Sequence, residues 1–238
     1  PLDRLAEEAA AAARDLVDPA LPRRPRVGIV GEIFLRSHPG ANQELIRLLE
    51  DLGGEVVSAS LTEWFNFVTH LNRRDAARDF QTGLADRDIP ALAASAKSRF
   101  VTRLTMDWQV KRQAAVYARV LPHLDIAPDH DVAHLERHLD HERLYSFAIG
   151  TEAGISIAGA LAYAEDDFDG VVNVFPFTCM PSTICSAILK PLLLKKNIPY
   201  LDSPHDGSSL PNRDITLRTY MHQVARRAEL RMMGGDVA

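Results

Sequence analysis

The chain has 238 residues, of which 46% are hydrophobic and 25% are charged, and its formal net charge is −5. This balance is typical of a globular protein with one large domain, or one domain with a sizeable insertion. The negative charge argues against a general nucleic-acid surface, and no apolar run approaches the roughly 20 residues that span a membrane. With two cysteines and no signal-peptide pattern, we expect a cytoplasmic protein.

The N-terminal residues predict a leading helix and a proline-rich connector over residues 1–25. Leu2–Val17 alternates Leu, Ala and charged residues at helical spacing, and Pro19, Pro22 and Pro25 then break the pattern. The chain begins with proline rather than methionine, as a processed chain or a piece of a longer polypeptide would.

Residues 26–61 predict the first half of an α/β sheet. Arg26–Gly31 has the pattern of a buried strand, Ala41–Leu52 that of an amphipathic helix, and Glu55–Ser58 that of a second short strand. These elements form a βαβ unit, whose crossover we expect to be right-handed.

The middle of the chain lacks this rhythm. Trp64–Leu71 carries an apolar stripe at helical spacing, Leu92–Leu121 continues as a long helical pattern, and Val132–Leu144 predicts a further helix. We therefore predict that residues 62–145 form a helical insertion between two halves of the sheet.

Residues 146–238 return to alternating helices and strands. Three helices and two strands are expected in the order Glu152–Ala164 (helix), Val171–Phe175 (strand), Ser182–Leu194 (helix), Ile198–Asp202 (strand) and Asp214–Arg231 (helix). The whole pattern predicts a three-layer α/β fold with a mainly parallel sheet and a large helical insertion.

Topology rules place the candidate site at one edge of this sheet. If the strands lie in the order second, first, third, fourth, the carboxyl ends of Val27–Gly31 and Val171–Phe175 are side by side. Gly31, Glu32 and Cys179 would then share one crevice, where open parallel sheets hold their ligands.

Cys179 lies between the third strand and the helix that follows it. Backbone N–H groups at a helix start favour an anion, including a thiolate, so Cys179 is a candidate soft ligand. A buried small hydrophobe is the structural alternative. Cys185 lies within an apolar helix and is expected to be structural.

Three segments resemble the domain of unknown function found with activases of 2-hydroxyacyl-CoA dehydratases. They are GEIFLRSHPGANQELIRLLEDLGGEVVSASLTEW (Gly31–Trp64), TEAGISIAGALAYAEDDFDGVVNVFPFTCMPSTICSAILK (Thr151–Lys190) and YLDSPHDGSSLPNRDITLRTYMHQ (Tyr200–Gln223). The run FPFTCMPST is the most specific part. The family is similar to the cluster-carrying subunits of those dehydratases and to double-cubane proteins.

This resemblance implies a Rossmann-like, flavodoxin-like fold and a cysteine-bound iron–sulfur (4Fe-4S) cluster. It makes Cys179 a cluster ligand. Glu32, which the strand topology places in the same crevice, is the second candidate cofactor-binding residue beside Cys179. It also implies an activase or dehydratase-type domain or subunit as partner, and acyl-CoA as a further candidate ligand.

The cysteine count departs from the family's pattern. A cubane cluster usually needs four thiolates, or three with another ligand, whereas this chain has only Cys179 and Cys185. On one helix these two would point about 120° apart. Any cluster must therefore draw cysteines from a missing domain or a partner. The phosphate loop G-x-x-x-x-G-K-[ST] is also absent from the sequence.

Other polar residues have structural alternatives. Glu32 could cap a helix or pair with an arginine, Asp206 suits a turn, and Asn42 and Glu152 suit helix starts. Four histidines recur at helical spacing, but charged residues between them favour a solvated face with adventitious metal binding over an evolved site; they are His130, His134, His138 and His141.

The functional expectation is a cluster-associated or partner-docking domain of a dehydratase/activase-type system, not a complete enzyme by itself. The alternative is a cluster-free regulatory module that binds a small molecule or a partner in the same crevice. A third class is a thiol enzyme with Cys179 as nucleophile. That class needs a base, for which His38 and His205 are the candidates, and no catalytic residue is assigned.

Overall fold

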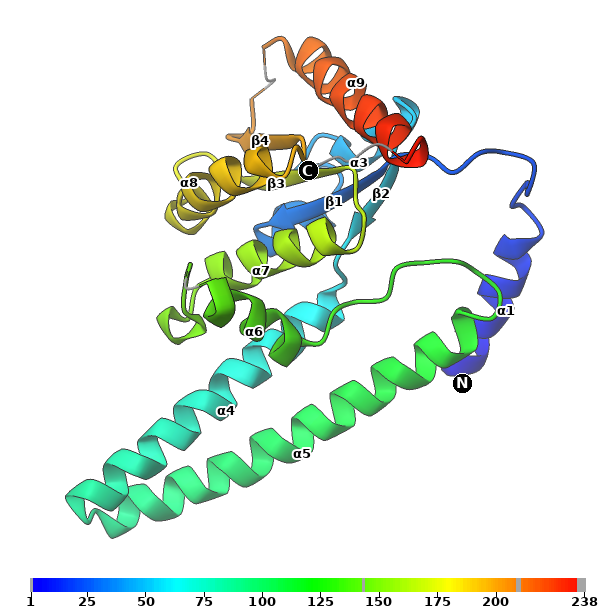
Figure 1. Cartoon of the computed structure of the whole chain (residues 1–238). Coiled ribbons are helices and arrows are strands. Elements are labelled where there is room, and N and C mark those ends of the chain that lie inside the picture. Colours follow the sequence, from blue (N-terminus) through cyan, green and yellow to red (C-terminus); the bar gives the residue numbers. More distant parts are fainter. Residues whose placement is uncertain (1, 143, 209–210, 235–238) are drawn as a thin grey trace. The chain divides into compact units, whose positions relative to one another are not determined.

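The computed structural model describes residues 2–142, 144–208 and 211–234 (Figure 1). The strands are β1 (Arg26–Gly31), β2 (Glu55–Ser58), β3 (Gly170–Pro176) and β4 (Tyr200–His205). The helices are α1 (Leu2–Arg14), α2 (Ile33–Ser37), α3 (Leu45–Asp51), α4 (Leu61–Asp86), α5 (Ile89–Val120), α6 (Val132–Glu142), the short 3₁₀ helix η1 (Phe147–Ile149), α7 (Glu152–Glu165), α8 (Met180–Lys195) and α9 (Arg213–Met232).

The described residues form two compact units. The first, the helical unit, comprises the residues up to Pro22 together with Thr62–Val132. The second, the sheet unit, comprises Arg23–Leu61 and the residues from Ala133 onward. The bounds of these units differ from those of the predicted segments. The leading helix α1 belongs to the helical unit, and most of α6 belongs to the sheet unit.

The sheet unit contains four parallel strands in the order β2-β1-β3-β4. The predicted α/β class, parallel pairing and strand order are thus confirmed. β3 reads GVVNVFP and is buried along most of its length, which explains why its sequence is apolar on both faces, except for Asn173, instead of alternating. In the register of β1 and β3, Gly31 lies opposite Val174.

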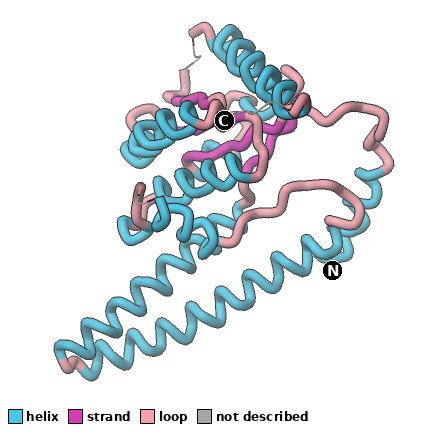
Figure 2. The backbone as a smooth tube through the Cα atoms, viewed as in Figure 1, coloured by secondary structure: helices cyan, strands magenta, loops and turns pink. Residues whose placement is uncertain are grey.

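Helices cover both faces of this sheet (Figure 2). On one face, α3 and α9 pack on β1 and β3 through buried apolar side chains; these are Val27, Ile29, Leu45, Leu49, Val172, Val174, Leu217, Tyr220, Met221 and Val224. On the other face lie α7 and α8. Gly28 of β1 has no side chain because the ring of Tyr163 from α7 occupies that space. This arrangement is compatible with a three-layer α/β fold.

The helical unit contains α1, α4 and α5. Its described residues include no strand, as predicted for the middle of the chain. α1 packs on α5, and the Asp3–Arg112 and Glu7–Arg119 ion pairs join them at 3.2 Å and 2.9 Å. Among the described helices of both units, none combines the length and apolar character that crossing a bilayer requires.

Several element boundaries differ from the sequence prediction, most clearly at the fourth strand and before α3. The fourth strand runs from Tyr200 to His205 rather than over Ile198–Asp202, because β3 extends to Pro176 and pairs there with His205. Pro204 lies within this strand because β4 is an edge strand, which tolerates proline. The short helix α2 was not predicted, and the turns after it delay the start of α3 to Leu45.

Candidate functional site at the carboxyl end of the sheet

The carboxyl ends of the parallel strands place the predicted site residues along one edge. Glu32 directly follows β1, and Cys179 follows the neighbouring strand β3 after a two-residue turn. The Glu32 N–H donates to the carbonyl oxygen of Val174 at 2.9 Å, which fixes the end of β1 against β3. Gly31 is left-handed (φ 116°), and a side chain there would overlap the Val174 carbonyl. Only glycine therefore fits this strand end.

Cys179 is the N-cap residue of α8 and is partly exposed. Its side chain makes no capping hydrogen bond, although its carbonyl accepts from the N–H and hydroxyl groups of Thr183. The flanking Phe177 and Met180 are 64% and 68% exposed. The thiol therefore lies at a helix start with apolar side chains open to solvent on both sides.

Cys185 has a different environment. It is only 1% exposed, and its Sγ donates to the carbonyl oxygen of Ala153 in α7 at 3.6 Å. Burial raises the pKa of the Cys185 thiol to about 12. The expected structural position is thus observed, and this thiol is not available as a second ligand beside Cys179.

Glu32 is the N-cap residue of α2. Its two carboxylate oxygens accept hydrogen bonds from the N–H groups of Phe34 and Leu35, at 3.0 Å and 2.9 Å. This is the capping alternative that the sequence left open. For Glu32 to bind a cofactor as well, its carboxylate would have to share these two bonds.

A partly buried polar network not predicted from the sequence lies between the sheet and α8. Asp202 Oδ1 accepts from Ser186 Oγ at 2.6 Å, from Tyr200 Oη at 2.7 Å and from Asn173 Nδ2 at 3.3 Å. Burial, with a contribution from Asp202, raises the pKa of Tyr200. Asn173 is fully buried, and its Oδ1 accepts no hydrogen bond from the described residues. The one asparagine in an apolar strand was the available signal.

A second polar cluster lies where β4 meets the start of α9. The Arg213 guanidinium donates to the carbonyl oxygens of Gln43 and Asn42, at 2.6 Å and 2.8 Å. His205 is 4% exposed and bonds Ser203 Oγ through Nε2 at 3.0 Å. Burial, and next the charge of Arg213, lower the pKa of His205. These contacts tie the loop after α2 to the start of α9.

The two candidate bases for a thiol enzyme have other roles. His38 Nδ1 accepts from the N–H of Ala41 at 3.0 Å, and the His205 ring bonds Ser203. No described residue forms a hydrogen bond with the Cys179 thiol. The arrangement therefore does not support the thiol-enzyme interpretation.

The histidines of α6 form a pair rather than a cluster. The Nε2 atoms of His134 and His138 are 2.9 Å apart, and His138 Nδ1 lies 3.3 Å from Glu165 Oε1. His134 and His141 are exposed as expected, but the His138 side chain is only 15% exposed. Within the described residues, no group of three or more His, Cys, Asp or Glu side chains could hold a metal.

The remaining candidates have the structural roles that the sequence favoured. Asn42 Oδ1 accepts from the N–H of Leu45 at the start of α3, and Glu152 lies in the first turn of α7. Asp206 accepts from the N–H and hydroxyl groups of Ser208 in a turn, and these bonds lower its pKa.

Comparison of this chain with protein-family models, with curated proteins and with solved structures finds no match.

Proposed function

We propose that this chain is a partner-docking domain of a 2-hydroxyacyl-CoA dehydratase/activase-type system, in which Cys179 supplies one thiolate to a shared iron–sulfur cluster. The sheet unit would be a Rossmann-like, flavodoxin-like domain that presents its carboxyl edge to an activase or dehydratase-type partner. The contrast between the two cysteines is the observation that carries this proposal. Cys179 is accessible at a helix start between exposed Phe177 and Met180, whereas Cys185 is sealed in the core.

The residues present fit one ligand of a cluster and not a complete set. Four cysteine thiolates usually hold a four-iron cluster, and only one of the two cysteines here is accessible. Such a cluster supplies one-electron transfer when bound. The part of this chain is to position the Cys179 thiolate and to offer the partner an apolar rim, while acyl-CoA would bind in the assembled system.

Alkylation of two single-cysteine variants tests the accessible thiol. The Cys185→Ser protein, which retains Cys179, should react rapidly, whereas the Cys179→Ser protein should react only after unfolding. Raising the Cys185 pKa from 9.0 to about 12 lowers its thiolate fraction about a thousandfold. Equal rates, or faster labelling of Cys185, would contradict the assignment.

Anaerobic reconstitution with iron and sulfide tests the cluster role. The isolated chain should bind less than a full four-iron cluster, its iron should depend on Cys179, and Cys185→Ser should retain it. A stable four-iron protein that is unaffected by Cys179→Ser would refute the proposal.

A second candidate function, a cluster-free module that binds an anion or a partner, is favoured by one observation. The side chain of the N-cap residue Cys179 does not cap the start of α8, so backbone N–H groups there can donate to an anionic group. If the chain is such a module, Cys179→Ser would leave its binding of the anion or partner intact. If Cys179 is a cluster ligand, the same substitution would not leave binding intact.

A further inference from the structure

The middle of α5 exposes a run of large apolar side chains, which we call the exposed face of α5. Phe100, Val101, Leu104 and Trp108 are 64%, 50%, 52% and 65% exposed. They cover two turns of one helix within the helical unit. A contiguous apolar stripe of this kind is typical of a protein-interaction surface, whereas single exposed apolar residues are ordinary.

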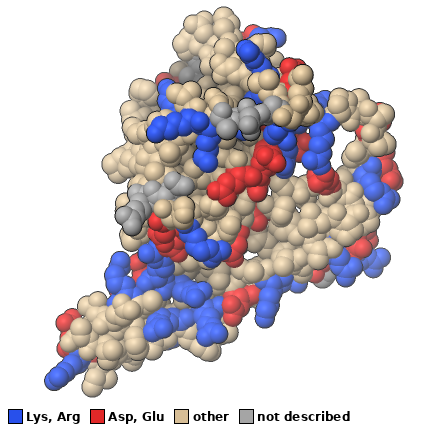
Figure 3. All heavy atoms as spheres, viewed as in Figure 1, with Lys and Arg blue, Asp and Glu red and all other residues tan. Residues whose placement is uncertain are grey.

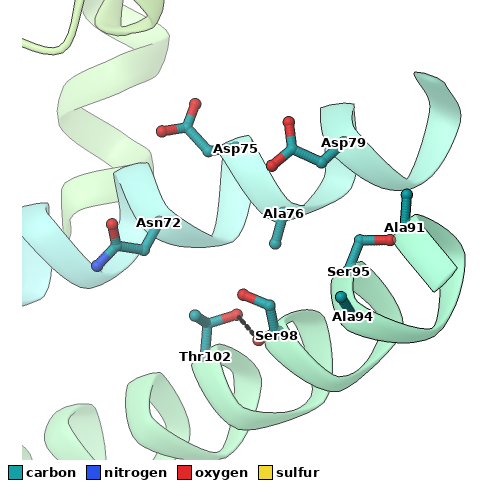
Figure 4. Close-up of a pocket in the computed structure, with 9 residues that line it drawn as sticks. All are labelled: Asn72, Asp75, Ala76, Asp79, Ala91, Ala94, Ser95, Ser98 and Thr102. Carbon is teal, nitrogen blue, oxygen red and sulfur yellow. Dashed lines mark hydrogen bonds between the residues drawn. The ribbon is translucent and has the colours of Figure 1, made fainter. Parts of the chain in front are cut away.

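The side of α5 that faces α4 is polar instead. A cavity of about 590 Å³ between these helices is lined largely by small and polar residues. Figure 4 shows Ala76 of α4 and Ser98 and Thr102 of α5 pointing toward each other. Two residues farther along a helix, a side chain points about 200° away, so Phe100 and Leu104 lie on the opposite side. The apolar side of α5 therefore faces away from α4.

The exposed face also has the spacing of a helix-pairing seam. Lys97, Val101, Leu104, Trp108 and Lys111 recur at intervals of 4, 3, 4 and 3 residues. Alternating intervals of three and four keep side chains on one side of a helix, where they can pack against a second helix. The occupant that fits this face is therefore another helix.

The charge of α5 indicates which kind of helix would bind to its exposed face. α5 carries six basic residues and one acidic residue, namely Lys97, Arg99, Arg103, Lys111, Arg112 and Arg119 against Asp107. Basic side chains gather along the α4 and α5 pair on the face shown in Figure 3. α1 already pairs with the C-terminal part of α5 through the Asp3–Arg112 and Glu7–Arg119 contacts. Carboxylates of a neighbouring helix are thus the groups that α5 pairs with within this chain, and the exposed face continues along the same helix.

A second copy of the chain fits this face poorly. Lys97 and Lys111 lie seven residues on either side of Leu104. In an antiparallel pair centred on Leu104, Lys97 of each copy would face Lys111 of the other. In a parallel pair, each lysine would face its own counterpart. Like charges oppose both arrangements.

We propose that the exposed face of α5 binds an acidic amphipathic helix of a partner protein. Apolar side chains of that helix pack on Phe100, Leu104 and Trp108, and its flanking carboxylates pair with Lys97, Arg103 and Lys111. This surface belongs to the helical unit and does not depend on the role of Cys179.

A designed peptide tests the proposal on the full chain. The probe is a three-heptad helical peptide with Leu at positions a and d and Glu at positions e and g, and its counterpart has Lys in place of Glu. We expect the acidic peptide to bind at least about tenfold more tightly than the basic one, with the difference decreasing as salt is added. In a Trp64→Phe background, binding should shift the fluorescence of Trp108 to that of a buried indole.

Two matched variants complete the test. Leu104→Glu should weaken binding of the acidic peptide at least about tenfold, whereas Val110→Glu should leave it unchanged. Both residues are exposed on α5, but Val110 lies outside the exposed face. Equal binding of the two peptides, or no effect of Leu104→Glu, would overturn the proposal. Self-association that Leu104→Glu abolishes would assign the face to a second copy, and peptide-independent binding to anionic vesicles would assign it to a membrane; either outcome also overturns it.

Discussion

His205 is a buried, neutral group whose environment gives the fold a pH dependence. Burial and the Arg213 charge lower its pKa below the ordinary 6.5. Below pH 6.5 the unfolded chain binds a proton that the folded His205 does not. The stabilisation that neutral His205 gives the folded state is therefore fully present above pH 6.5. It is lost as the pH falls toward the lower pKa that His205 has in the folded protein.

We expect His205→Gln to reduce the loss of unfolding free energy between about pH 7.5 and about pH 5.5. Urea unfolding at several pH values measures this change. His222→Gln is the matched control, because His222 is an exposed histidine of α9. An unchanged pH profile in His205→Gln, or the same change in both variants, would contradict this account.

A partly buried ion pair connects strand to helix at the amino ends of the strands, opposite the candidate site. Asp169, just before β3, is fully buried and accepts from Arg231 of α9 through two bonds at 3.1 Å and 3.2 Å. Its Oδ2 also accepts from the N–H of Arg26 at the start of β1. One carboxylate thus connects β1, β3 and α9.

Asp169→Asn should lower the free energy of unfolding by about 3 kcal/mol, because it leaves the Arg231 charge without its partner and weakens the bond to β1. Asp214→Asn removes an exposed carboxylate that pairs with Arg218 at 2.8 Å, and should have no measurable effect. Chemical denaturation of both variants provides the comparison. Similar losses in the two would show that burial does not set the strength of this contact.

Sequence patterns were sufficient for the elements whose residues share one environment. The apolar run of β3 and the long helical pattern of α5 identified both elements, and parallel topology then placed Cys179 at the carboxyl edge. The patterns failed where a side chain depends on a distant partner. The role of Asp202 depends on its hydrogen bonds with Ser186 and Asn173, and no local spacing in the sequence predicts these contacts.

At the scale of the whole molecule, we predict that the described fold does not depend on a metal. The sheet unit is held by an apolar core on α3 and α9, and the histidine pair of α6 contacts Glu165 and Arg137. We expect a strong chelator to leave the melting temperature unchanged, measured by circular dichroism with and without added zinc. A large fall after chelation would reveal a structural metal.

β4 is an edge strand of the sheet, and its sequence affects whether two copies of this protein can pair edge to edge. The carbonyl oxygens of Pro199 and His205 accept from the β3 side, so the alternate residues, including Pro204, turn their backbone groups outward. Proline has no N–H to offer there. An incoming strand would therefore find no N–H donor at Pro204, one residue before the end of β4. The absence of this one N–H works against edge-to-edge pairing of sheets, which is the first step toward fibrous aggregates.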